Sequence, residues 1–309
     1  MTRRSLLQSL VLLAGLVALA FVARRSLQEA STQAMPGPGS LVAAGSLALL
    51  ALIAVARAWI AVFGDHVHSR FSRVRLAGGF YASQLSKYLP AGGLLQAASQ
   101  VNLATATGLP LGRVAIAFPV AALCSLVAGG VLGVGLAFDI QLPTWVRVVS
   151  ACGLASVALL WRKIMAIALA TARRVIHRLP AVDRLPSQTE ILHCFAWALL
   201  GLASFCGAFT VLLASLADEV SPGVAFSAYA VSWVIGFLAV PVPAGVGVRE
   251  LVLVALLPDV GTGPLVGASL ALRLIAIVTE IAAIGANRLV QRRVRRLDAA
   301  SSSPETVAM

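Results

Sequence analysis

Residues 224–257 read VAFSAYAVSWVIGFLAVPVPAGVGVRELVLVALL, and this stretch decides the class of fold. A long apolar run ends at residues 241–245 (PVPAG), and a shorter apolar run follows Arg249 and Glu250. Proline and glycine interrupt helices, and interrupted backbone is tolerated at membrane depth only where protein or a wet cavity surrounds it. The stretch therefore predicts a re-entrant hairpin, in which two short helices enter a membrane and leave on the same side.

A second stretch, residues 78–107, has the same design in the first half of the chain. It is partly apolar, carries several polar side chains and is broken at residues 90–93 (PAGG), so it is not expected to be a simple span. Both stretches turn at Pro-Ala-Gly, at residues 90–92 and 243–245. Interrupted segments at matching positions in two halves of a chain are typical of transporters with inverted repeats.

The composition of the whole chain indicates an all-α integral membrane protein. Of 309 residues, 59% are hydrophobic and 12% are charged, whereas soluble domains carry about 25% charged residues. Besides the two hairpins, the chain has apolar runs long enough to be full spanning helices. These six runs lie at residues 5–23, 40–63, 113–138, 145–161, 191–217 and 265–288.

The basic residues predict the orientation of these spans. The net charge of +12 arises from Lys and Arg in short blocks between the apolar runs, and such blocks stay on the cytoplasmic side. This explains the charge without a nucleic-acid partner. With both termini inside, the loop cations left outside are Arg24, Arg25 and Arg147.

The predicted topology divides the chain into two halves and a tail. Residues 1–138 and 145–289 each consist of two spans, a hairpin and a third span, in opposite orientations. They form a single polytopic domain of residues 1–289 with inverted repeats. Residues 290–309 are expected to form a cytoplasmic tail that is first basic and then disordered.

Ionisable residues within the membrane segments are the first candidates for function, because each costs about 2.5–3.5 kcal/mol on insertion scales. Arg57 lies near the cytoplasmic end of its helix, where its side chain is expected to reach the headgroups. The others are Lys87, Arg249, Glu250, Arg273 and Glu280.

These five residues predict either an anion site or a structural network of ion pairs. Glu250 lies in the first turn of a half-helix, where it can interact with the helix dipole and leave Arg249 to bind a phosphate. Arg273 and Glu280 share one face of the last span but are too far apart to pair. We expect Arg273 to pair with Glu250, and Glu280 to pair with Arg249 or Lys87.

The two broken phrases also resemble the signatures of a known family. Residues 81–93 (YASQLSKYLPAGG) and 108–113 (GLPLGR) resemble the first signature of the lysylphosphatidylglycerol synthase transmembrane-domain family, also called flippase-like. Residues 241–250 (PVPAGVGVRE) resemble its second signature, Pro-x-Pro-x-Gly-x-Gly-x-Arg-Glu. The resemblance covers residues 41–289. It implies a multi-pass protein of a prokaryotic inner membrane that moves or handles phospholipid or isoprenoid-linked headgroups.

The chain also departs from the family pattern. Ala91 stands where members often have Gly directly after the first Pro, and the stretch after the turn lacks the expected aromatic or basic residue. These differences bear on which headgroup is handled. The aminoacyl-transferring domain of bifunctional members is not expected after the last span, so the chain should not synthesise lysylphosphatidylglycerol.

The sequence thus predicts a lipid flippase-like transporter that is not an enzyme and uses no cofactor or metal. Its expected partners are membrane lipids with an anionic or lipid-linked phosphate headgroup, and a homo-oligomer is left open. The alternatives are a non-catalytic partner of a cell-envelope glycosyltransferase and a membrane-embedded transferase with Glu250 as base. The candidate substrate-binding residues are Lys87, Tyr88, Pro90, Gly92, Gln96, Pro243, Gly245, Arg249, Glu250, Arg273 and Glu280.

Overall fold

The structure is a computed structural model in which the described part of the chain is entirely helical. The described residues are 36–64, 67, 70–88, 92–139, 163, 185–217, 220–239, 245 and 247–302. Within the described residues, four helices are long and apolar enough to cross a membrane, and they coincide with four of the predicted spans. They are α2 (Pro38–Ala61), α5 (Leu111–Asp139), α7 (Gln188–Ala214) and α10 (Thr262–Ser302). The predicted spans at residues 5–23 and 145–161 lie outside the described residues.

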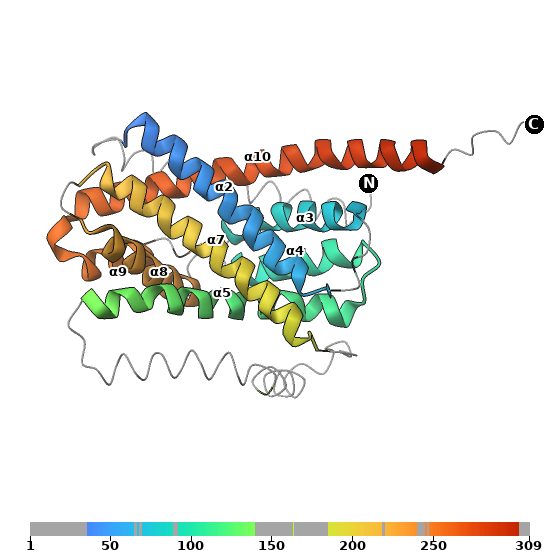
Figure 1. Ribbon diagram of the computed structural model, residues 1–309, viewed down its shortest axis with the longest axis horizontal. Coiled ribbons are helices and arrows are strands. Elements are labelled where there is room, and N and C mark those ends of the chain that lie inside the picture. Colours follow the sequence, from blue (N-terminus) through green and yellow to red (C-terminus); the bar gives the residue numbers. More distant parts are fainter. Residues whose placement is uncertain are drawn as a thin grey trace, which may run out of the picture.

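The long helices form the body of the molecule, with α2 and α7 crossing it side by side (Figure 1). A small residue permits their close approach, because a Cβ atom at Gly201 of α7 would lie 3.2 Å from the Ala51 carbonyl oxygen of α2. Helices in membranes commonly pack through such small residues. Helix α5 packs against α7, and α10 packs against both α2 and α7.

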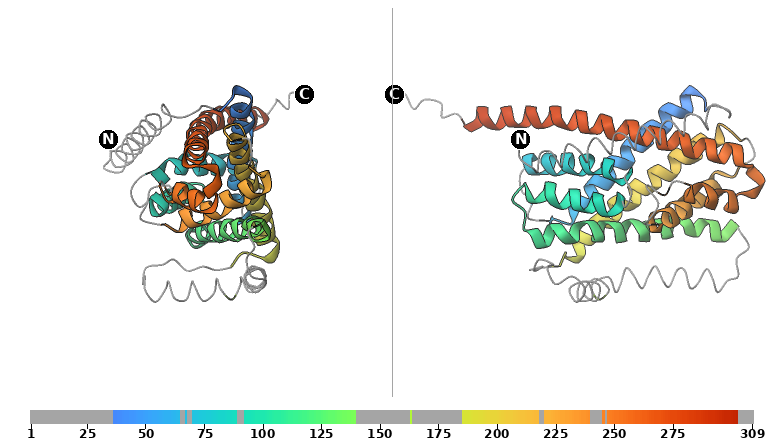
Figure 2. Two further views of the ribbon diagram at one scale, coloured as in Figure 1. Left: turned by 90° about the vertical axis from the view of Figure 1, so that its left-hand side faces the viewer. Right: turned by 180° about the vertical axis from the view of Figure 1, so that it is seen from behind.

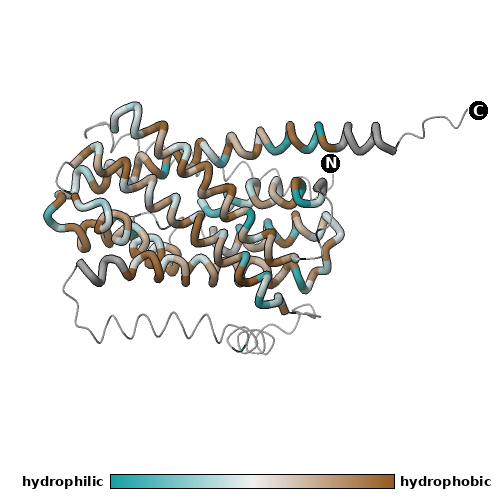
Figure 3. The backbone as a smooth tube through the Cα atoms, viewed as in Figure 1, coloured by the Kyte–Doolittle hydropathy of each residue, from teal (hydrophilic) through white to brown (hydrophobic). Residues whose placement is uncertain are grey.

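Large apolar side chains remain exposed on the outer faces of these helices. Val42 on α2, Leu192 on α7 and Val278 on α10 are each more than half exposed. Apolar residues recur along much of α2, α5 and α7 (Figure 3). Water disfavours an apolar surface of this kind, whereas lipid accommodates it. The protein is therefore a helical membrane protein.

Each interrupted stretch forms a pair of short helices, as predicted. The first hairpin consists of α3 (Arg70–Gln84), the 3-10 helix η2 (Leu85–Tyr88) and α4 (Gly92–Thr105). The second consists of α8 (Pro222–Leu238) and α9 (Val248–Leu256), followed by the short 3-10 helix η4 (Pro258–Val260). The first hairpin lies toward one end of the long helices and the second toward the other end, as Figure 1 and the view from behind in Figure 2 show.

Two helix boundaries differ from the sequence prediction. The first interrupted stretch was predicted to begin at residue 78, but α3 begins at Arg70. Leu76 and Phe80 of α3 are buried, and this packing outweighs the polarity of the surrounding arginines. Helix α10 continues beyond residue 289 and reaches Ser302 as one helix, which projects past the other helices (Figure 1).

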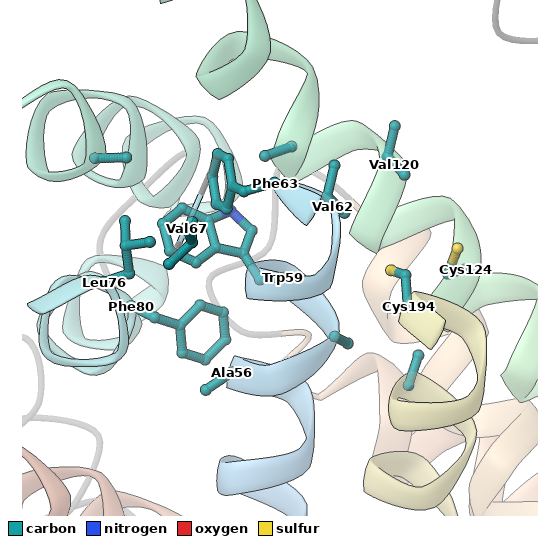
Figure 4. Packing of buried hydrophobic residues seen from close by; sticks show 14 of the residues in the cluster. Ala56, Trp59, Val62, Phe63, Val67, Leu76, Phe80, Val120, Cys124 and Cys194 are labelled. Atoms are coloured by element: carbon teal, nitrogen blue, oxygen red, sulfur yellow. The ribbon is translucent and has the colours of Figure 1, made fainter. Parts of the chain in front are cut away.

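Among the described residues, two large apolar clusters form most of the interior, one near each hairpin. The cluster of the first hairpin is centred on Trp59, whose ring meets Phe63 edge to face at a centroid distance of 4.9 Å (Figure 4). In the cluster of the second hairpin, Phe209 stacks on Tyr229 at 4.5 Å. The described cysteines, Cys124, Cys194 and Cys206, are buried with free thiols.

Candidate functional site

Helix α10 binds both hairpins through ion pairs on one face. Arg273 donates from Nη2 to Oε1 of Glu250 on α9 at 2.8 Å. Glu280 pairs with Lys87, which lies in η2 at the tip of the first hairpin. Arg273 and Glu280 are seven residues apart, or about 10 Å along the helix at 1.5 Å per residue. The predicted pairing of Arg273 with Glu250 is confirmed, and Glu280 takes Lys87, one of its two predicted partners.

The contact at the first hairpin is incompletely hydrogen-bonded. Lys87 Nζ lies 3.5 Å from Oε1 of Gln84 and 5.2 Å from the ring centroid of Tyr88. The Glu280 side chain is 4% exposed, and its Oε2 atom is buried without a well-formed hydrogen bond from the described residues. The buried Tyr88 side chain also interacts with Glu280 as a hydrogen-bond partner. Glu280 therefore has a second partner in the first hairpin besides Lys87.

The contact at the second hairpin is complete. Oε2 of Glu250 accepts a hydrogen bond from the backbone N–H of Gly247 at 2.8 Å, which caps the N-terminus of α9. Oε1 accepts from Ser269 Oγ at 2.7 Å as well as from Arg273. The prediction that Glu250 interacts with the start of the half-helix is confirmed. Both oxygens are used, so Glu250 supports the arrangement of α9 and α10.

Glycines make the tip of the second hairpin compact. Gly245 has φ +67°, and a Cβ atom there would lie 2.9 Å from the Gly236 carbonyl oxygen. Gly247 has φ +83° immediately before α9. Left-handed backbone and backbone-to-backbone contact both favour glycine. These residues bring the chain back against α8 and orient the N-terminus of α9.

Arg249 has no acidic partner among the described residues. Its stem packs against Gly236, and its guanidinium carbon lies 5.9 Å from the ring centroid of Trp233. The Nε atom is buried without a hydrogen-bond acceptor from the part of the chain that the structure describes. A guanidinium group needs several acceptors and is seldom left without them. Arg249 thus has unused capacity to bind an anion.

Buried tyrosines connect the charges of the two hairpins. Tyr88 of the first hairpin is 3% exposed and interacts electrostatically with Glu280, Arg273 and Arg249. Tyr229 of α8 is also buried and interacts with Arg249 and Arg273. The charged residues of both tips therefore belong to one region along α10.

The remaining predicted site residues are not part of the ion-pair network, or they lie outside the described residues. Gly92 is the first residue of α4. Gln96 lies on α4, half-buried, and makes no polar contact with a described residue. Pro90 and Pro243 lie outside the described residues.

Arg57 was predicted to reach the headgroups from its place near a helix end, and this stays a prediction. Its side chain is exposed, and its guanidinium carbon lies 6.0 Å from the ring centroid of Trp197. A cation above an indole ring is attracted by the ring electrons and needs no acidic partner. Arg57 is therefore not part of the charged region along α10.

A buried ion pair at the start of α5 was not predicted from the sequence. Arg113 Nη2 donates to Glu190 Oε2 at 2.6 Å, and Arg113 Nε donates to the Val62 carbonyl oxygen at 3.1 Å. Glu190 also forms a capping box with Ser187 at the start of α7. The Ser-x-x-Glu spacing was the available signal for the cap, whereas nothing local indicated Arg113 as the partner.

A row of polar contacts inside the first hairpin, called here the polar seam, was not predicted from the sequence either. Gln100 Nε2 of α4 donates to Ser83 Oγ of α3 at 3.3 Å. Ser86 and Ser99 share a hydrogen bond of 3.1 Å. Gln100 is 2% exposed, and its side-chain oxygen has no partner among the described residues. The two arms of this hairpin thus meet through polar groups.

Comparison with known families identifies one match. The family described as lysylphosphatidylglycerol synthase TM region matches residues 6–283. No curated protein matches the chain. Among the described residues, no group of three or more His, Cys, Asp or Glu side chains is arranged to bind a metal ion.

Proposed function

This chain belongs to the lysylphosphatidylglycerol synthase TM region family, and on that premise we propose that it is a lipid flippase-like transporter. Its substrate is a phospholipid or an isoprenoid-linked lipid with a phosphate headgroup. It acts as a multi-pass protein of a prokaryotic inner membrane, with both termini in the cytoplasm. Transport requires no chemical step on the lipid.

Arg249 is the observation that carries this proposal. It lies in the first turn of α9, has a buried Nε without an acceptor and has no acidic partner among the described residues. A phosphate can accept two parallel hydrogen bonds from one guanidinium group. The N-terminus of a helix also favours an anion. Both features support a phosphate headgroup at Arg249.

The balance of charge supports the same substrate. Lys87 and Arg273 are each paired with a carboxylate, which leaves Arg249 uncompensated by any carboxylate among the described residues. A phosphodiester headgroup carries one negative charge, so its binding would neutralise the site. Binding energy for a charged group at membrane depth depends on such compensation.

The placement of the hairpins supports alternating access. Both hairpins are proposed to be re-entrant, the first from the cytoplasm and the second from the opposite side. Their tips contact α10 through separate ion pairs, so each hairpin can detach while the other remains bound. Inverted repeats around a central site are a common design of transporters.

The transferase alternative is disfavoured by the contacts of Glu250. Both of its oxygens accept hydrogen bonds from Gly247, Ser269 or Arg273, so neither is directed at a substrate. A role as non-catalytic partner of a glycosyltransferase has no specific observation in its favour.

The proposal is tested with Arg249→Lys in liposomes that contain fluorescent phosphatidylglycerol. Lysine retains the charge and most of the stem but cannot form the bidentate contact. We expect the initial rate of lipid movement to fall about tenfold, which corresponds to the loss of one charge-assisted hydrogen bond. The melting temperature in detergent should not change.

Arg57→Lys is the matched control, because Arg57 is an exposed membrane arginine outside the charged region. It should leave transport unaltered. A melting temperature that falls in step with transport in Arg249→Lys would instead indicate a structural arginine. Full transport by Arg249→Lys would exclude the phosphate site.

A further inference from the structure

Three residues of α8 lie on the face of that helix that meets Arg249. Trp233, Gly236 and Phe237 are three or four residues apart, so they share one side of the helix. Helix α8 packs against α9, and Arg249 contacts Trp233 and Gly236. Both arms of the second hairpin therefore contribute to the surroundings of Arg249.

Gly236 provides the space for the stem of Arg249. A Cβ atom at this position would lie 2.5 Å from Cγ of Arg249, 2.8 Å from Nε and 3.2 Å from Cδ. Non-bonded carbon atoms are normally about 3.5–4.0 Å apart, so a larger residue than glycine would have to move Arg249. The stem is thus packed directly on the backbone of α8.

Trp233 restricts the position of the guanidinium group. Its ring centroid lies 5.9 Å from Cζ of Arg249, within the range of a cation–π contact. Phe237 stacks on Trp233 at a centroid distance of 5.3 Å and an interplanar angle of 18°, and this stacking holds the indole ring. A side chain that is already immobilised loses less entropy when a ligand binds. The contacts with α8 therefore preorganise the guanidinium group.

The contact of Arg57 with Trp197 provides a comparison within the same molecule. The distance from guanidinium carbon to ring centroid is similar there, at 6.0 Å. Arg57 and Trp197 are exposed, whereas Arg249 and Trp233 are half-buried. A cation–π contact is stronger where the cation has lost water. The contact in the second hairpin is therefore expected to restrain its arginine more.

We propose that Trp233 is a positioning residue for the anion site and holds the Arg249 guanidinium group where a phosphate headgroup meets it. The inference rests on the proposed phosphate site at Arg249. Trp233 acts through Arg249 rather than by contact with the phosphate. Its contribution to binding should therefore disappear when the guanidinium group is removed.

The test measures binding of dihexanoyl phosphatidylglycerol to the full chain in a neutral maltoside detergent by isothermal titration calorimetry. Trp233→Leu removes the ring, whereas Trp233→Phe leaves a comparable volume and retains an aromatic face. We expect the dissociation constant to rise about fivefold in Trp233→Leu and less than about twofold in Trp233→Phe. If only the packed volume matters, the two variants should bind alike.

Dependence on the guanidinium group is tested by combining Trp233→Leu with Arg249→Lys. Lysine lacks the planar group that lies over the ring. In this background, Trp233→Leu should therefore weaken binding by less than about twofold. A fivefold loss in both backgrounds would show that Trp233 does not act through Arg249, and would overturn the inference.

Trp197→Leu is the matched control for the ring, because it removes a tryptophan beside Arg57, which is not part of the charged region. It should leave the dissociation constant unchanged. The melting temperature of each variant, measured in the same detergent, shows whether it remains folded. A similar loss of binding in Trp197→Leu and Trp233→Leu would contradict a specific role for Trp233.

A second variant displaces Arg249 while every aromatic ring is retained. Gly236→Ala forces the Arg249 stem away from α8 and should weaken binding about tenfold. Gly223→Ala, on the same helix, adds a methyl group that meets only Ser221 Oγ at 4.0 Å. It should bind as the unchanged protein does. Unaltered binding in a folded Gly236→Ala variant would show that the seat on α8 does not position the arginine.

The outcomes distinguish this inference from the proposed transport. Binding that depends on Arg249 and Trp233, without lipid movement in liposomes, would support the positioning role and contradict transport. Transport together with equal binding by Trp233→Leu and Trp233→Phe would contradict the positioning role alone. Absence of binding by the unchanged protein would overturn both the phosphate site and the role of Trp233.

Discussion

The two hairpins contact the same helix, α10, but their contacts differ in completeness. In the second hairpin, Glu250 is fully hydrogen-bonded and its partner Arg273 is 9% exposed. In the first hairpin, Lys87 is 28% exposed and Glu280 retains a buried oxygen without a well-formed hydrogen bond. Satisfied buried networks favour a single arrangement, whereas unsatisfied ones weaken it. The comparison indicates that the second hairpin is held more firmly than the first.

The backbones of the two hairpins also indicate that the second hairpin is held more firmly than the first. Gly245 of the second hairpin has a positive φ and lies against the backbone of Gly236, whereas Gly93 near the start of α4 faces open space. In the proposed transport cycle, the first hairpin is therefore expected to move more readily, and the second to hold the phosphate site around Arg249.

The largest effect should come from removing the carboxylate of the second hairpin. Glu250→Leu leaves Arg273 buried without a partner and α9 without its cap, which should cost about 3–5 kcal/mol of stability. Glu280→Leu leaves Lys87 without its carboxylate partner, but the Lys87 side chain can reach solvent. This variant should therefore lose about 1–2 kcal/mol of stability. Melting temperatures in one detergent compare the two variants. A larger loss for Glu280→Leu would reverse the ranking of the hairpins.

The glycines provide an intermediate effect that involves no charge. Gly245→Ala must accept φ +67° and a contact of 2.9 Å with a carbonyl oxygen, so we expect a loss of about 1–3 kcal/mol. Gly93→Ala adds a methyl group in open space within α4 and should stabilise the protein by about 0.5–1 kcal/mol. Thermal unfolding of both variants checks this. Equal effects would mean that the tips are packed alike.

The smallest effect is expected at Gln100, inside the polar seam of the first hairpin. Its oxygen is already unsatisfied, and Ser83 Oγ also bonds the Phe80 carbonyl at 2.6 Å. Gln100→Leu should therefore change stability by less than about 0.5 kcal/mol. Ser269→Ala in the second hairpin removes a bond to Glu250 and should cost about 1 kcal/mol. A clear loss for Gln100→Leu alone would show that the seam stabilises the first hairpin.

Local sequence was sufficient for the helices and their interruptions. The apolar runs predicted α2, α5, α7 and the membrane part of α10. A run of about 20 apolar residues indicates a spanning helix whichever helices pack against it. Proline and glycine predicted the breaks in both hairpins for the same reason. The predicted start of the first hairpin was wrong, because α3 is stabilised by the burial of Leu76 and Phe80, which is a tertiary effect.

The candidate site was only partly predictable. A spacing of seven placed Arg273 and Glu280 on one face of a helix, which required each to find a partner on another segment. Glu280 had two acceptable partners in sequence, and only the position of η2 against α10 assigned it to Lys87. That assignment left Arg249 unpaired.

The sequence by itself determined that the chain is a helical membrane protein with two interrupted segments, because chain-local hydrophobicity and backbone chemistry decide both. The tertiary structure alone decided which charges meet. Lys87 and Glu280, or Arg113 and Glu190, are far apart in the chain and pair through helix packing. The strength of an ion pair depends on distance and burial, which no local pattern of residues specifies.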